Sequence, residues 1–346
     1  MDKKDIIVIG ASAGGLEVLK QLFSNLGPKI DAAIFIVWHM SADVRGFLPR
    51  ILRKHSSLPI EHAQDFAPIE LNRVYVAPPD RHLLVEKGHV RLTKGPKENR
   101  FRPAIDPLFR SAAYAYASRV IGVILSGSLD DGTAGMWTIK CFGGTTVVQD
   151  PREAEFPSMP HSALREVPID YKVSVANMPG LLTQLIDKPA EEKRTEKEEL
   201  QKTVNEIRVA MLEDQSETGR EIGTLTPYAC PDCHGVLSQI KEGNIMRYRC
   251  HTGHAFSSDT LLSILSASVE NSIWNAIRGL EETMFLLNGL GDHYGSLNQP
   301  KKSGLYFKKA KEMELRCQHL RQALLNNDTL TKEFIEGNEG KLVETN

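Results

Sequence analysis

The sequence of 346 residues has few cysteines, no long apolar run and almost no net charge. Cys141 and Cys317 stand alone and the other three of the five cysteines cluster, a pattern that suits a reducing cytosol with one metal site better than a disulfide framework. The longest apolar run, AAIFIVWHM, is far shorter than the roughly 20 residues that span a bilayer. A formal net charge of −2 gives no reason to expect nucleic acid or an anionic membrane as a partner.

The N-terminus carries charged residues and then enters a strand-like segment, without the apolar region of a signal peptide. We therefore expect a cytoplasmic protein. A chain of this length is expected to hold more than one domain, because single cores rarely grow much beyond about 250–300 residues.

The first half of the sequence alternates strand-like and helix-like segments. Amphipathic helical patterns occupy residues 16–26 and 106–118. The strand-like segments are DIIVIG, DAAIFIVWHM, RVYVAPP, RVIGVILSGS and GTTVVQD. This alternation predicts an α/β fold, doubly wound around a mainly parallel sheet with Rossmann-type layers. The segment LLVEKGHVRLTKG differs and predicts a hairpin that turns at Lys87-Gly88.

Composition changes after Ile186, where a charged stretch begins. We predict four parts: an α/β domain (1–187), a charged, partly helical linker (188–222), a small cysteine-containing module (223–258), and a helical hairpin with a tail (259–346). The linker carries a short coiled-coil-like stripe, Leu200, Val204, Ile207 and Met211. Two heptads are too few to establish dimerisation, so pairing with another chain and packing on the same chain both remain open.

Two long helical patterns follow the cysteines. The first has its apolar stripe at Leu262, Leu265, Val269, Ile273, Ile277, Leu280, Met284 and Leu287, and the second at Tyr306, Ala310, Met313, Cys317, Leu320 and Leu324. The intervening GLGDHYGSLNQPKKSG is rich in turn-forming residues, so we expect it to connect an antiparallel helical hairpin. Cys317 lies on the second stripe and is expected to be a small buried side chain.

The segment IIVIGASAGG places a serine in a glycine-rich turn between an expected strand and an expected helix. GASAG fits the G-x-S-x-G pattern of a nucleophile elbow, in which the hydroxyl stands clear of the sheet beside unpaired helix N–H groups. A dinucleotide site is a weaker interpretation, because Ser12 replaces the glycine that would approach a pyrophosphate. Ser12 could also act only as a helix cap.

Two further polar groups follow buried strands. His39 ends the next strand, and Asp130 and Asp131 follow the strand RVIGVILSGS. Neighbouring parallel strands end at one edge of a sheet, so a base and an acid could reach Ser12 there. One of the two aspartates is expected only to shape the loop, because Asp-Gly is a common turn signal. The order serine, histidine, aspartate differs from that of α/β-hydrolases.

Several blocks of the sequence resemble, in the same order, the catalytic domain of the bacterial chemotaxis protein-glutamate methylesterases. They are IGASAGG, WHM, RVYVAPPDRHLLV, RPAIDPLFRSAA, GVILSGSLDDGTAGM, GGTTVVQD and SMPHSAL, within about residues 4–187. The resemblance implies a serine hydrolase that cleaves γ-glutamyl methyl esters on methyl-accepting chemoreceptors and releases methanol. It also implies deamidation of receptor glutamines and no cofactor for catalysis.

By position in the family motifs, Ser12 would be the nucleophile and His39 the general base. Asp131 would be the orienting acid, because the family's aspartate directly precedes the loop glycine. The residues near the substrate and the oxyanion would be Ala13, Gly14, Met40 and Ser128.

The sequence departs from the family pattern in three places. The family loop G-M-G-x-D-G is GSLDDG here, with Ser128 in place of the methionine, and Ala13 stands where threonine or serine is common. The first catalytic strand is expected from Asp5, so we expect no N-terminal receiver domain and no control by phosphorylation in cis. Regulation would then be constitutive, in trans, or through the C-terminal half.

The segment CPDCHGVLSQIKEGNIMRYRCHTGH contains a C-x-x-C pair and, one expected hairpin later, a C-x₃-H pair. Three cysteines and one histidine form an accepted closed set for structural zinc, and metal binding would stabilise a segment with little core. We therefore predict a zinc-ribbon-like module with the ligands Cys230, Cys233, Cys250 and His254. His234 and His251 remain alternative fourth ligands.

Taken together, the residues favour a cytoplasmic methylesterase whose zinc module and helices bind partners, including other chemosensory proteins, or regulate activity. A catalytically weak or inactive adaptor remains an alternative because of the altered loop at Ser128. A nucleotide-binding α/β protein is a weaker one.

Overall fold

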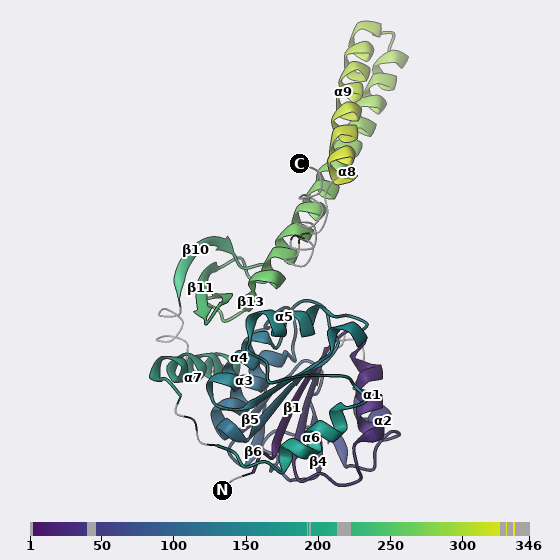
Figure 1. Ribbon diagram of the computed structural model, residues 1–346. Helices are drawn as coiled ribbons and strands as arrows, with labels where there is room; N and C mark the ends of the chain where they lie inside the picture. The colour runs from purple at the N-terminus through teal and green to yellow at the C-terminus, as the bar shows by residue number, and fades with distance from the viewer. Residues whose placement is uncertain are drawn as a thin grey trace, which may run out of the picture. The chain divides into compact units, whose positions relative to one another are not determined.

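The computed structural model describes residues 3–39, 46–191, 193, 195–212, 223–325, 330 and 335 (Figure 1). The chain divides into two compact units, Met1–Thr260 and Leu261–Asn346. The two units are described in turn.

The first unit contains a central sheet of seven parallel strands: β1 (Ile6–Ala11), β2 (Ala33–Trp38), β3 (Ile60–His62), β4 (Arg73–Val76), β7 (Val120–Ile124), β8 (Thr145–Gln149) and β9 (Tyr171–Val173). Their order in the sheet is β3-β4-β2-β1-β7-β8-β9. This confirms the predicted α/β class with a mainly parallel sheet. Because β1 pairs with β2 on one side and β7 on the other, the carboxyl end of β1 lies where the strand order reverses, the usual ligand position in such sheets.

Among the described residues, the α-helices that accompany this sheet are α1 (Gly15–Asn25), α2 (Leu48–Leu52), α3 (Ile105–Tyr116), α4 (Thr133–Cys141), α5 (Ser158–Glu166) and α6 (Met178–Ile186). The helices expected over residues 16–26 and 106–118 are present as α1 and α3. Side chains alternate along the strands, so Ile6 and Val8 face one core while Ile7 and Ile9 face the other.

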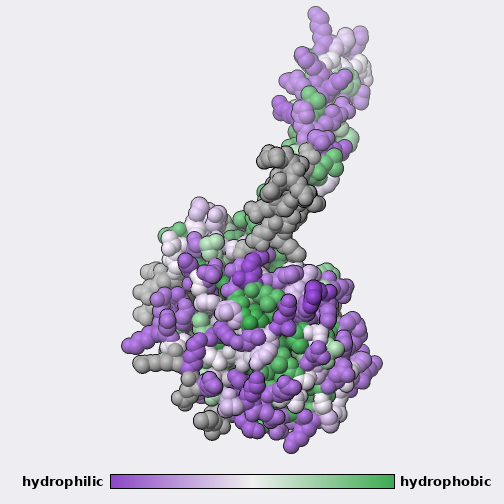
Figure 2. All heavy atoms as spheres, viewed as in Figure 1, coloured by the Kyte–Doolittle hydropathy of each residue, from purple (hydrophilic) through white to green (hydrophobic). Residues whose placement is uncertain are grey.

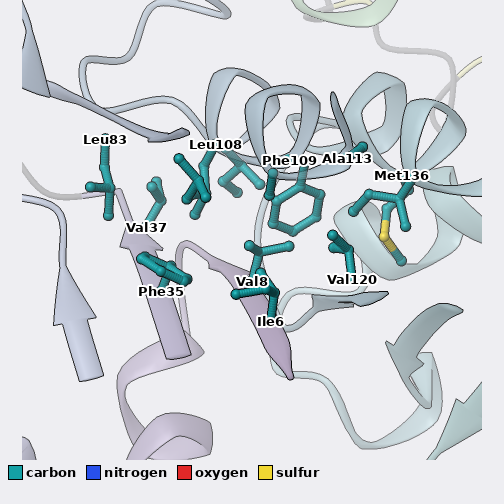
Figure 3. Close-up of a cluster of buried hydrophobic side chains, with 14 of the residues drawn as sticks. Ile6, Val8, Phe35, Val37, Leu83, Leu108, Phe109, Ala113, Val120 and Met136 are labelled. Atoms are coloured by element: carbon teal, nitrogen blue, oxygen red, sulfur yellow. The ribbon is translucent and has the colours of Figure 1, made fainter. Parts of the chain in front are cut away.

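The first of these cores contains strand residues packed against α3 and α4. Figure 3 shows Ile6 and Val8 of β1 below Phe109 of α3, with Phe35 and Val37 of β2 to their left. The second core packs the opposite strand face against α1, α2 and α6. Helices therefore cover both faces of the sheet, so a ligand can reach it at the ends of its strands.

The predicted hairpin consists of β5 (His82–Glu86) and β6 (His89–Thr93), and it turns at Lys87-Gly88 as expected. Gly88 has φ +83°, a left-handed conformation that glycine adopts without strain.

Helix α7 (Lys197–Met211) lies in the segment predicted as a charged, partly helical linker, and it packs on α3. Its buried residues are Thr203, Glu206, Val209 and Ala210. None of the residues of the predicted coiled-coil-like stripe is among these buried residues. Leu200 is exposed, whereas Val204, Ile207 and Met211 line a cavity of about 550 Å³ together with residues of β5 and α3.

The cysteine-containing module belongs to the first unit. It is an antiparallel sheet of β10 (Thr224–Ala229), β11 (Val236–Glu242), β12 (Ile245–Cys250) and β13 (Ala255–Ser257). Gly243 and Asn244 form the turn between β11 and β12, where the sequence predicts a hairpin.

The second unit contains most of α8 (Ser258–Ser296) and all of α9 (Pro300–Leu325). The expected connection over residues 289–304 is wrong in extent, because only residues 297–299 lie between the helices. Its glycines are helical instead. At Gly291 a Cβ would lie 2.8 Å from the Phe307 ring, so this glycine permits close packing of the two helices.

Cys317 is buried, as expected. The surface of the helical pair is mostly hydrophilic with separate apolar patches (Figure 2), and Phe285, Leu286 and Leu305 are exposed there. Within the described ranges, no helix combines the length and the apolar character that crossing a membrane requires.

Candidate active site

Ser12 lies in the turn between β1 and α1, at the carboxyl edge of the sheet. Gly14 has φ +70°, which brings the chain sharply from strand to helix. The Ser12 N–H donates to the Ser126 carbonyl (2.9 Å), and the Trp38 indole N–H donates to the Ser12 carbonyl (2.9 Å). A Cβ on Gly127 would lie 2.8 Å from the Ser12 Cβ, so the absence of a side chain lets the loop after β7 pass close to the serine.

His39 follows β2 and connects Ser12 to Asp131. Its Nδ1 lies 3.3 Å from the Ser12 Oγ, and its Nε2 lies 2.7 Å from the Asp131 Oδ2. The His39 and Asp131 side chains are each only 2% exposed, whereas Ser12 is half-buried and so keeps access to solvent. The Phe101 ring stacks on the imidazole with centroids 3.7 Å apart and planes 7° apart, which restricts rotation of His39.

The environment of Asp131 keeps this carboxyl ionised. Burial opposes ionisation, but hydrogen bonds from His39, the Ile105 N–H (2.7 Å) and the Asn99 Nδ2 (2.9 Å) outweigh it and lower the pKa of Asp131 to about 2. A carboxylate only accepts hydrogen bonds, so His39 Nε2 carries the proton. The neutral imidazole then presents the Nδ1 lone pair to the Ser12 hydroxyl, as a general base requires.

The remaining residues that the sequence places near the substrate and the oxyanion lie on three segments of the chain. Ala13 and Gly14 form the turn beside Ser12, and their N–H groups donate to no acceptor within the part of the chain that the structure describes. Ser128 follows Gly127 and is exposed. Met40 lies outside the described residues.

The two aspartates of the loop have separate partners. Asp130 accepts hydrogen bonds from the Ser257 Oγ (2.5 Å) and the Thr260 Oγ1 (3.3 Å), and only Asp131 contacts the imidazole of His39. The expectation that one aspartate shapes the loop therefore applies to Asp130, which holds the junction of β13 and α8.

Three residues of the site were not predicted: Asn99, Phe101 and Asp106. Asn99 donates to Asp131 and also to the Asp106 Oδ2 (3.3 Å). Burial and the nearby charge of Asp131 raise the pKa of Asp106 well above its usual value, and this carboxyl accepts the Gly135 N–H (2.7 Å). Asn99 and Phe101 lie on a loop without periodicity, and no sequence signal short of a known motif marks them.

The four predicted metal ligands come together. One ligand atom from each of Cys230, Cys233, Cys250 and His254 lies within 4.8 Å of the others. The first pair follows β10 and the second flanks the turn from β12 to β13. Three thiols and an imidazole fit the tetrahedral preferences of Zn²⁺. The alternatives, His234 and His251, do not belong to this group.

A serine, a histidine and an aspartate in hydrogen-bonding sequence, at the switch point of a parallel sheet, are the arrangement of a serine hydrolase. Comparison with known proteins agrees with this class. The family model described as CheB methylesterase matches residues 7–182. The chain belongs to the CheB methylesterase family.

Several relatives carry the words protein-glutamate methylesterase/protein-glutamine glutaminase in their names. A Leptospira interrogans protein is 40% identical over 182 residues, which are 52% of this chain and 94% of that protein. A Thermotoga maritima protein is 35% identical over 185 residues, which are 52% of this chain and 54% of that protein. This chain thus spans about half the length of the Thermotoga relative. The predicted enzyme class, protein-glutamate methylesterase, is confirmed by the family and these names.

The crystal structure of the Thermotoga maritima CheB methylesterase catalytic domain is also similar to this chain. It aligns with a TM-score of 0.51 at 35% identity and covers 54% of this chain and 100% of that chain. The fold of the methylesterase part is therefore shared, while the cysteine-containing module and the helical pair lie beyond the matched family region.

Proposed function

We propose that this chain hydrolyses glutamate γ-methyl esters on methyl-accepting chemoreceptors, with Ser12 as the nucleophile and His39 as the general base and then acid. Asp131 orients the imidazole. The observation that carries the proposal is the continuous hydrogen-bonded series from Ser12 Oγ through both nitrogens of His39 to the Asp131 carboxylate. The names of the relatives support a protein glutamate methyl ester as the substrate, and the chemoreceptor as its carrier follows from the family resemblance.

In the first half of the reaction, Ser12 Oγ attacks the ester carbonyl while His39 Nδ1 takes its proton. The imidazolium is stabilised by Asp131 and then gives this proton to the methoxy oxygen, which leaves as methanol. Water next attacks the acyl-enzyme with the same help from His39 and releases the glutamate carboxylate. Glutamine deamidation would follow the same steps with ammonia as the leaving group.

The turn before α1 is the proposed oxyanion site. The N–H groups of Ala13 and Gly14 lie at the start of this helix, where backbone donors and the helix dipole favour negative charge. Ser128 is exposed and follows Gly127, which lies close to Ser12, and we propose that Ser128 contacts the substrate in place of the family methionine.

We propose a structural zinc in the module, held by the four ligands described above. A closed set of four protein ligands leaves no position for substrate, so the metal would stabilise the fold and take no part in the reaction. The module and the helical pair are proposed to bind other chemosensory proteins. The cytoplasmic location remains a prediction.

The test is methanol release from membranes that carry methylated receptors, with wild type compared with Ser12→Ala. We expect release by the wild type and its loss in the variant. Ser24→Ala is a matched control, because Ser24 Oγ also lies 3.3 Å from a histidine, His55, but on the surface, and this variant should retain full activity. If the wild type shows no Ser12-dependent release, the adaptor alternative is favoured instead.

A further inference from the structure

The side chain of Asn99 connects the active site to the cysteine-containing module. Its Nδ2 donates to the Asp131 Oδ1 (2.9 Å) and the Asp106 Oδ2, while its Oδ1 accepts the backbone N–H of Ser257 (2.8 Å). The Asn99 backbone N–H donates to the Ala255 carbonyl (2.8 Å). The residue is 2% exposed, and both ends of its amide are engaged. Because a backbone N–H can only donate and a carboxylate can only accept, these partners fix the orientation of the amide.

Ala255 and Ser257 belong to β13, which directly follows the proposed ligand His254. The turn between β12 and β13, which carries the proposed ligands Cys250 and His254, is closed by a hydrogen bond from the Cys250 N–H to the His254 carbonyl (3.0 Å). The Ala255 N–H then donates to the Lys97 carbonyl (3.2 Å). The segment that leaves the metal site is therefore the segment that holds both sides of Asn99.

A second contact of β13 reaches the residue before Asp131. Ser257 Oγ donates to Asp130 at 2.5 Å and accepts the Thr260 N–H at 3.0 Å. The loop that carries the orienting carboxylate is thus held by β13 at two adjacent residues: at Asp131 through the side chain of Asn99, and at Asp130 directly.

A fully buried network of ion pairs holds the module against the α/β domain. Its members are Glu98, Arg110, Glu206, Glu242, Arg247 and Arg249, none more than 4% exposed. Arg247 of β12 lies 3.1 Å from Glu98 and 3.0 Å from Glu206, and Arg110 of α3 contacts both of these carboxylates. Glu98 is the neighbour of Asn99 in sequence. The network therefore fixes the backbone next to Asn99 as well as the position of the module.

We propose that Asn99 is a positioning residue for the Ser12–His39–Asp131 site and that β13 of the cysteine-containing module sets its orientation, so that the folded, metal-bound module is required for full hydrolytic activity. This inference rests on the function proposed above. It gives the cysteine-containing module a role in activity through a buried amide, with no need for the module to touch the substrate.

The first test compares Asn99→Ala with Asn205→Ala. Asn205 lies on α7 and bonds only Gln201 on the same helix among the described residues, so it is a matched control. Loss of a hydrogen bond to a charged group is expected to lower kcat about 10- to 100-fold with little change in KM, since Asn99 acts through Asp131. The proton on His39 Nε2 should also shift or broaden in the NMR spectrum of Asn99→Ala, with the resonance assigned by its loss in His39→Gln.

The second test compares His254→Ala with His251→Ala in the full chain. The two histidines lie in the same turn, but only His254 belongs to the four-ligand group. We expect His254→Ala to lose bound zinc, to perturb the His39 Nε2 proton as Asn99→Ala does, and to lower kcat by a similar factor. His251→Ala should match wild type in all three measurements.

Each result separates this inference from the proposed function. An active wild type together with an unchanged kcat and His39 proton in Asn99→Ala would refute the positioning role. Loss of zinc in His254→Ala without any effect on the His39 proton would refute the link to the module. If the wild type has no Ser12-dependent activity, the proposed function fails, while the NMR comparison still decides whether the module sets the site.

Discussion

Asp130 and Asp131 are adjacent in the sequence but hold two different parts of the molecule. Asp131 accepts a hydrogen bond from His39 Nε2, whereas Asp130 accepts one from the Ser257 hydroxyl at the junction of the module and α8. The same turn therefore binds the His39 imidazole through one aspartate and the cysteine-containing module through the other. This arrangement separates the chemical role of the loop from its structural role.

Asp131→Asn should lower kcat by about 10⁴-fold, because the amide can stabilise the wrong tautomer of His39 and cannot balance the charge of the imidazolium. KM should change little. Steady-state methanol release measures both constants. Asp187→Asn is the control, because Asp187 is exposed and pairs with Lys3 before β1, whereas Ser12 follows the other end of that strand. This variant should be as active as wild type.

The stability of the folded chain should depend on the ionisation of Asp131 at acid pH. Its pKa falls from 3.8 to about 2 on folding, so its stabilising contribution is complete above about pH 4 and is lost as the pH falls towards 2. The contribution is roughly 2 kcal/mol. Urea unfolding at pH 6, 4 and 3 should show the difference between wild type and Asp131→Asn shrinking with falling pH. A constant difference would contradict the role of the charge, since carboxylates common to both proteins cancel.

The sequence predicts much of the α/β domain because β1, β7 and β8 are buried along their whole length and α1 and α3 are amphipathic. Ser12, His39 and Asp131 could be found because each follows a buried strand, and parallel strands end at one edge. Asn99 and Phe101 could not be found this way, because packing of the module and of the imidazole sets their positions. The sequence predicts Gly291 to be a turn residue, whereas it is helical, because a helical glycine that admits Phe307 has the same local signal as a loop glycine.

Gly127→Ala should reduce activity by about 100-fold, because a displacement of about 1 Å at a reacting group has an effect of this size. The added Cβ would lie 2.8 Å from the Ser12 Cβ and 2.0 Å from the Met159 Sδ. The methionine end can move, but the serine Cβ is fixed by its turn. Gly180→Ala on α6 meets nothing within 4 Å and should instead stabilise the chain by roughly 0.5–1 kcal/mol, as thermal unfolding would show. If Gly127→Ala is as active as wild type, the close approach of Gly127 to Ser12 does not hold the nucleophile in position.

One zinc per chain is expected, and Cys230→Ser should lose it. With three ligands left, the module should unfold locally, because metal binding supplies much of the folding free energy of such small segments. Elemental analysis and hydrogen exchange over residues 223–257 measure the two effects. Cys141→Ser is the control, since this cysteine lies outside the ligand group and should keep the metal. Folded wild type without metal would contradict the assignment.

Glu206→Ala should destabilise the chain by about 3–5 kcal/mol, the typical effect of breaking a buried ion pair from one side. Glu206 accepts hydrogen bonds from Arg110, Arg247 and Arg249, and its loss leaves three buried guanidinium groups with two carboxylates. Burial would raise the pKa of Glu206, but these arginines lower it well below its usual value, so the charge is present throughout the neutral range.

The matched control for this change lies on the same helix. Glu198 forms an exposed pair with Lys202 at 2.8 Å, and Glu198→Ala should leave the urea midpoint unchanged because exposed pairs contribute little. Glu206→Gln keeps the shape of the side chain but removes the charge, so its midpoint should fall between those of wild type and Glu206→Ala. Equal midpoints for all four proteins would mean that the network does not hold α7 and the module to the domain. The coupling between module and active site would then depend on β13 alone.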